Sequence, residues 1–124
     1  MRTGRFCASE RAAAMPMTSG ARPSAVFAAN DLNALGMISE FNRLGVGVPS
    51  EISVVGYDDT SYVGNGPQGL TTVHQPVHEM GSRAAELLLE RIDGGRTESA
   101  HEVLPPTLVV RSTCSTSLSS SMST

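Results

Sequence analysis

The chain has no lysine and no tryptophan, and it has only two cysteines. A Walker-type phosphate-binding loop needs a lysine, and so does an enzyme that forms a Schiff base, so both classes are excluded. Cys7 and Cys114 lie near opposite ends of the 124 residues and show no CxxC spacing. Two such cysteines form neither a disulfide framework nor a zinc site, although one bridge between them stays possible. This cysteine usage fits a reducing compartment.

Strong charge and long apolar runs are also lacking. The formal net charge is -3, which argues against nucleic-acid binding by bulk electrostatic attraction. No apolar run approaches the roughly 20 residues that a membrane span requires. The first residues include Arg and Ala but no apolar segment of the signal-peptide type. We therefore expect a cytoplasmic protein without membrane contact.

Motifs for catalysis and metal binding are lacking as well. The sequence has no GxSxG and no HExxH segment. His74 and His78 stand at positions i and i+4, a spacing that can hold a metal on a helix. Pro76 lies between them, however, and no third ligand is near. We expect neither an enzyme, nor a metal site, nor a cofactor.

The chain does contain two short apolar runs that each end in amide or carboxylate side chains. AVFAAND covers Ala25–Asp31, and ISVVGYDD covers Ile52–Asp59. An apolar run bounded by turn residues is typical of a buried parallel strand. Ligands of open α/β sheets bind at the carboxyl ends of such strands. We therefore expect Asn30 and Asp58 to lie where a small polar ligand would bind.

Helical patterns separate the expected strands. A helix capped by Asn30 or Asp31 runs to about Leu44. A second helix follows Pro76 and ends near Ile92, with the clearest amphipathic spacing in the chain. The other expected elements are a short helix over 8–18, a polar loop over 57–69, and strands over 71–74 and 107–110. This order predicts an α/β layer architecture with too few strands for a whole sheet.

Several segments resemble the carboxyl-terminal half of a LacI/GalR-family transcriptional regulator. They are RPSAVFAANDLNALGMISEFNRLGVGVPSEISVVGYDD, LTTVHQPVHEMGSRAAELLLERIDGG and LPPTLVVRST, in unbroken order from about Arg22 to Thr113. The resemblance implies a partial periplasmic-binding-protein-like (type I) fold, with a parallel sheet flanked by helices in an incomplete domain. We expect a short helical lead-in over 1–21, a partial effector-binding domain over 22–113 and a disordered Ser/Thr-rich tail over 114–124. An incomplete domain should leave a sheet edge and apolar helix faces uncovered.

The resemblance also implies a small-molecule effector, a sugar or related polyol or a nucleobase, bound between two subdomains. Three positions match the effector contacts of the family: Asn30 of the AND motif, Asp58 after the Gly-aromatic pair, and Gln75 of the TTVHQ segment. By spacing alone, such an Asp more often caps a turn, and the resemblance favours the ligand contact. Asp59 is expected to be structural or solvated. A further contact at Val77 is a weaker expectation.

A dimer is implied too, because in the family the helix over 31–44 and the loop after the Asp pair help build the dimer interface. Met37, Phe41 and Tyr62 are the candidates, with ordinary core packing as the alternative. A full regulator also carries a DNA-binding helix-turn-helix, which this sequence lacks. The function implied is effector sensing and dimerisation within a LacI-type regulator. The alternative is a fragment of a periplasmic sugar-binding protein of a transporter, and the segments VPSEISVVGYDD and RST favour the regulator.

Overall fold

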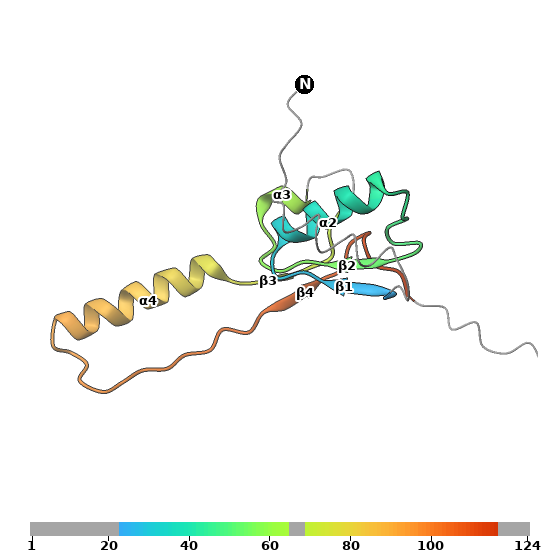
Figure 1. The fold of residues 1–124 in the computed structure, drawn as a ribbon. Coiled ribbons are helices and arrows are strands. Elements are labelled where there is room, and N and C mark those ends of the chain that lie inside the picture. The colour runs from blue at the N-terminus through green and yellow to red at the C-terminus, as the bar shows by residue number, and fades with distance from the viewer. Residues whose placement is uncertain (1–22, 65–68, 117–124) are drawn as a thin grey trace, which may run out of the picture.

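The computed structural model describes residues 23–64 and 69–116. Figure 1 shows a small α/β body from which one long helix projects. The elements are β1 (Ala25–Phe27), α2 (Asp31–Arg43), β2 (Ser53–Val55), α3 (Ser61–Gly64), β3 (Thr72–His74), α4 (Val77–Ile92) and β4 (Thr107–Val109). This order confirms the predicted α/β class. The helix expected over 8–18 lies outside the described residues.

Parallel pairing between β1 and β2 forms the base of the body, as the two apolar runs predict. Ala25 pairs with Ser53, and the next two residues of each strand follow in register. Beyond Val55 the chain continues parallel to β3, where the N–H of Asp58 donates to the carbonyl of Val73 at 2.9 Å. β4 then pairs antiparallel with β3. The carboxyl ends of β1, β2 and β3 therefore meet at one edge.

The bounds of α2 follow from the residues at its two ends. Asn30 caps the amino end, because its Oδ1 accepts the backbone N–H of Asn33 at 2.8 Å. At the other end Gly45 adopts φ +75°, a conformation that glycine accepts without steric cost. The N–H of Val46 can then donate to the carbonyl of Phe41 at 2.9 Å, which closes the last turn. The predicted helix is confirmed.

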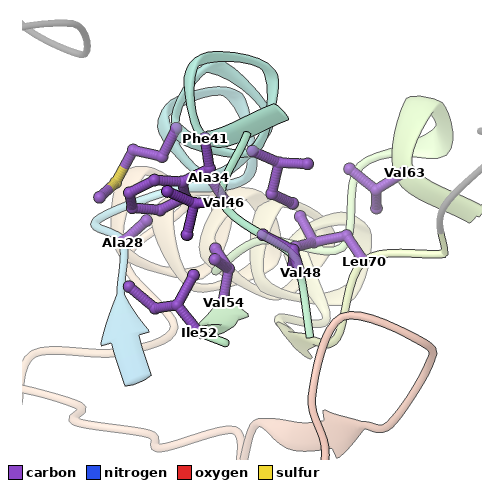
Figure 2. Packing of buried hydrophobic residues seen from close by; sticks show 11 residues of the cluster. Ala28, Ala34, Phe41, Val46, Val48, Ile52, Val54, Val63 and Leu70 are labelled. Carbon is purple, nitrogen blue, oxygen red and sulfur yellow. The ribbon is translucent and has the colours of Figure 1, made fainter. Parts of the chain in front are cut away.

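A core of buried apolar side chains fills the space between α2 and the sheet (Figure 2). Its members are Ala28, Ala34, Met37, Ile38, Phe41, Val46, Val48, Ile52, Val54, Val63 and Leu70. Met37 is 6% exposed and Phe41 is fully buried. Both side chains therefore pack inside this chain, as the alternative interpretation holds, and a place for them in a dimer interface stays a prediction. Burying such a side chain favours folding by about 1.5–3 kcal/mol, so α2 turns this face toward its own sheet.

One buried carboxylate connects α2 to the segments that follow it. Asp31 is 1% exposed. Its Oδ2 accepts the backbone N–H of Thr60 at 2.8 Å, and its Oδ1 accepts the hydroxyl of Thr72 at 2.5 Å. The N–H of Asp31 donates to the carbonyl of Tyr57 at 2.8 Å. Bonds to an ionised carboxylate at a helix amino terminus are strong ones, so they fix the start of α2, the turn after β2 and β3 together.

The helix α4 and the segment that returns from it project from the body as an arm, residues 77–106 (Figure 1). The predicted amphipathic helix is confirmed, but none of its residues is buried. Its large exposed apolar side chains are Val77, Met80, Leu88, Leu89 and Ile92. The expected uncovered helix face is thus present among the described residues. None of the described helices has both the length and the apolar character that crossing a membrane requires.

The strands and two connecting segments differ in detail from the prediction. Each strand holds three residues and is shorter than predicted. A one-turn helix, α3, replaces part of the predicted loop over 57–69, because Val63 buries its side chain in the core and donates its N–H to Thr60 at 3.0 Å. Within the expected tail over 114–124, the N–H of Ser115 donates to Oγ of Ser53 at 3.2 Å. Residues 117–124 lie outside the described part, and the proposed division into segments stays a prediction.

The uncovered surfaces predict that the 124-residue chain associates with itself. Exposed apolar side chains on α4 and the outer edge of β1 favour contacts between copies. Size-exclusion chromatography with light scattering should give a mass above the 13.0 kDa of one chain. A Leu88→Glu, Ile92→Glu double variant, at positions 60% and 68% exposed, should shift the population toward the monomer. A monodisperse wild-type monomer that unfolds cooperatively would contradict this prediction.

The bonds of Asp31 predict a large effect of a small substitution. Asp31→Asn keeps the size of the side chain but removes its charge and places an NH₂ group against donors of Thr60 or Thr72. The free energy of unfolding should fall by about 1.5–3 kcal/mol, the usual contribution of hydrogen bonds to a charged group. Urea unfolding measures this change. Asp93→Asn, at an exposed position after α4, is the control and should cost less than about 0.5 kcal/mol; equal losses in both variants would refute the role of Asp31.

Candidate binding site

The structure brings the three predicted contact residues to the same edge of the body. Asn30 follows β1, Asp58 follows β2 and Gln75 follows β3. The backbone N–H directly after Asn30 donates to the carbonyl directly before Asp58 at 2.8 Å. Asp58 forms a parallel β-bridge with His74, the neighbour of Gln75. Strand pairing, rather than closeness in sequence, assembles this group.

Asp58 and Gln75 are in direct contact. Nε2 of Gln75 donates to Oδ1 of Asp58 at 2.8 Å, and both side chains are partly buried. Among the described residues, neither Oδ2 of Asp58 nor Oε1 of Gln75 has a hydrogen-bond partner. Each can therefore accept a hydrogen bond from a ligand. Nothing in the sequence pattern indicated that these two residues contact each other.

The side chain of Asn30 caps α2 through its oxygen and keeps its NH₂ group as a donor. The sequence left the cap of α2 open between Asn30 and Asp31. In the structure Asn30 is the cap, and Asp31 bonds to the later segments. Oδ1 of Asn30 is occupied by the cap, while its Nδ2 has no partner within the described part of the chain. The edge therefore presents one amide donor near a carboxylate and an amide acceptor, an arrangement suited to hydroxyl or N–H groups of a small ligand.

The turn that carries Asp58 has an unusual backbone. Asp58 has φ 109° and Asp59 has φ 54°. Residues other than glycine rarely adopt such φ values, and each instance costs roughly 1–3 kcal/mol. Strained positions of this kind cluster at functional sites. Sequence reasoning did not predict this strain, because aspartate does not signal a positive φ in the way that glycine does.

Asp59 takes part in an ion-pair cluster beside this turn. Its Oδ1 accepts Nη2 of Arg111 at 2.7 Å, and its Oδ2 lies 3.1 Å from Nδ1 of His74. Burial acts to raise the pKa of Asp59, but the hydrogen bonds and charges of Arg111 and His74 outweigh it and hold the pKa below its ordinary value. Asp59 is thus ionised at neutral pH. The structure supports the structural interpretation of Asp59, and it adds Arg111, which sequence reasoning left without a role.

The remaining candidates are Tyr62, Val77 and the pair His74 and His78. The side chain of Tyr62 on α3 lies outside the described residues. Val77 begins α4 and is 61% exposed. His74 ends β3 while His78 belongs to α4, so the two do not share a helix. No group of three or more possible metal ligands occurs in the described ranges.

A cavity of about 270 Å³ lies in the arm, between α4 and residues 100–104. None of Asn30, Asp58 and Gln75 lines it. Its charged groups are already paired, because Arg83 donates to both carboxylate oxygens of Glu102 at 2.8 and 2.7 Å. The hydrogen bonds from Arg83 hold the pKa of Glu102 below its ordinary value. The strand ends, with acceptors and a donor still available, are therefore the better candidate for a binding site.

Comparison with known proteins agrees with the sequence resemblance. The family model described as "Periplasmic binding protein-like domain" matches residues 2–114. The transcriptional repressor PurR of Vibrio vulnificus is 44% identical over 92 residues, which are 74% of this chain and 28% of that protein. PurR of Pectobacterium atrosepticum is 43% identical over 91 residues, 73% of this chain and 26% of that protein. The chain thus spans little more than a quarter of the length of these relatives.

Solved structures give the same assignment. The Lac repressor dimer bound to operator and an anti-inducer matches with a TM-score of 0.77 and 34% identity, over 86% of this chain and 37% of that one. A LacI-family regulator from Enterococcus faecium with bound ribose matches with a TM-score of 0.78 and 30% identity, over 85% and 39%. The regulator CelR in complex with cellobiose gives 0.76 and 36%, over 85% and 32%. The predicted resemblance and partial fold are confirmed: the chain belongs to the periplasmic binding protein-like domain family, and over most of its length it is similar to part of these repressors and LacI-family regulators.

Proposed function

We propose that this chain forms one wall of the binding site for a small-molecule effector in a LacI-type transcriptional regulator. The observation that carries the proposal is the junction of three strand ends, where Asn30, Asp58 and Gln75 come together. Ligands of open parallel sheets bind at such carboxyl ends. The proposed role is binding, without catalysis.

A sugar or related polyol fits this wall best. An ionised carboxylate accepts strong hydrogen bonds from hydroxyl groups, and the free oxygen of Asp58 is available for one. The amides of Asn30 and Gln75 add a donor and an acceptor. The bound ribose and cellobiose in similar regulators support this effector class. A nucleobase, which also offers N–H donors, is the second class.

We propose that the full-length protein is a cytoplasmic homodimer that binds DNA through a separate amino-terminal domain. The similarity to the operator-bound Lac repressor dimer supports this assembly. Met37 and Phe41 fill the core of this chain, which favours a dimer interface formed by other residues.

The alternative, a sugar-binding protein of a transporter, shares the fold but has less support. The similar curated proteins named above are repressors, and the similar solved structures are regulators. The coding sequence upstream of residue 1 distinguishes the two. A helix-turn-helix in frame supports the regulator, and an export signal supports the transporter protein.

Effector binding tests the proposed contact of Asp58. In the full-length protein, isothermal titration with ribose, glucose and cellobiose should find at least one ligand. Asp58→Asn should weaken its binding by about tenfold or more, because the loss of a charge-assisted hydrogen bond costs that much affinity. Asparagine tolerates a positive φ, so this variant keeps the turn.

Asp93→Asn is the matched control, since it removes the same charge from an exposed position on the arm. Its affinity should equal that of the wild type. Unchanged binding in Asp58→Asn would sink the assignment of Asp58 as an effector contact.

A further inference from the structure

The carboxylate of Asp59 contacts both strands that connect the body to the arm. β3 leads into the arm and β4 returns from it (Figure 1). One oxygen of Asp59 accepts Nη2 of Arg111 at 2.7 Å, just beyond β4, and the other lies 3.1 Å from Nδ1 of His74, the last residue of β3. The side chain of Asp59 is 17% exposed and that of Arg111 is 24% exposed. The ion pair between Asp59 and Arg111 is thus better shielded than an ordinary surface pair, while the side chain of His74 is 48% exposed.

Two members of this cluster lie next to a proposed effector contact. Asp59 directly follows Asp58, and His74 directly precedes Gln75. Arg111 is itself held in place, because its Nη1 donates to the carbonyl of Leu70 at 2.9 Å. The bond between Asp59 and His74 therefore connects two backbone segments. The residues next to this bond in the two segments, Asp58 and Gln75, form the contact at the proposed effector site.

The strained backbone of the turn explains why it needs the contacts of Asp59. With φ at 109° and 54°, Asp58 and Asp59 would relax toward more favourable angles unless bonds held them. The N–H of Asp58 holds one side through its bond to Val73 at 2.9 Å. The carboxylate of Asp59 holds the other side through two cationic or proton-donating groups.

We propose that Asp59 is a positioning residue for the effector site: its contacts with Arg111 and His74 hold the strained turn and the end of β3 so that Asp58 and Gln75 face the effector. This inference rests on the proposed function for its link to the effector, and on the geometry above for the positioning itself. It assigns to Asp59 no contact with the effector.

Amide hydrogen exchange on the 124-residue chain tests the positioning without any ligand. In Asp59→Asn, the amide of Asp58 should exchange about tenfold faster, because the turn opens locally. The amide of Val54, bonded to the carbonyl of Thr113 at 2.9 Å within the core, should stay within about twofold. Asp59→Glu, which keeps the charge, should restore slow exchange. Glu102→Gln removes a comparable ion pair in the arm and should leave Asp58 unchanged.

Two results would overturn the proposal. An unchanged rate at Asp58 would mean that Asp59 does not hold the turn. Equal acceleration at Asp58 and Val54 would mean that Asp59 contributes to global stability alone.

Titration of the full-length protein supplies the link to the effector. Asp59→Asn should weaken binding of ribose, glucose or cellobiose, whichever the wild type binds, by about tenfold at a temperature where both proteins are folded. Asp59→Glu should recover most of the affinity. Unchanged affinity in Asp59→Asn would refute positioning of the effector site. A wild type that binds none of the three sugars would count against a sugar as the proposed effector class, and the exchange rates would still decide whether Asp59 holds the turn.

Discussion

The rest of this structure depends on the hydrogen bonds that the buried carboxylate of Asp31 accepts. It stands at the first residue of α2 and receives donors from Thr60 after β2 and from Thr72 on β3. The space around it is so tight that a Cβ added at Gly56 would lie 2.5 Å from its Oδ1. A buried charge without partners would be costly. The hydrogen bonds to Asp31 compensate for its burial and connect the segments that donate them. Three chain segments are held at one point in this way.

The proposed binding site is a direct consequence of that junction. Asn30 immediately precedes Asp31, Asp58 lies shortly before Thr60, and Gln75 lies shortly after Thr72. The bonds that hold Asp31, Thr60 and Thr72 together therefore also hold their neighbours in the chain, the three proposed contact residues, at the same edge. The arm is different, because none of the residues of its helix is buried and large apolar side chains on that helix are exposed. The body thus has a finished core and an organised edge, while the arm presents a surface that only further protein can cover.

Sequence reasoning predicted the features that depend on local signals. Asn30 and Gly45 mark the ends of α2, and the resemblance to the family pointed to Asn30, Asp58 and Gln75. It did not predict what depends on contacts between distant residues, such as the bonds of Asp31 or the cluster around Asp59. The apolar face of α2 illustrates the limit: periodicity shows that Phe41 is covered, but it cannot tell whether the chain's own sheet or a second copy covers it. The structure answers that the sheet does.

The most direct test of this account is a crystal structure of the full-length protein with its effector bound. The account predicts a ligand hydroxyl or N–H within hydrogen-bond distance of Oδ2 of Asp58, with the side chains of Asn30 and Gln75 on the same ligand. The account would be contradicted by a ligand bound elsewhere, for example in the arm cavity beside Arg83 and Glu102, with the strand ends left unoccupied.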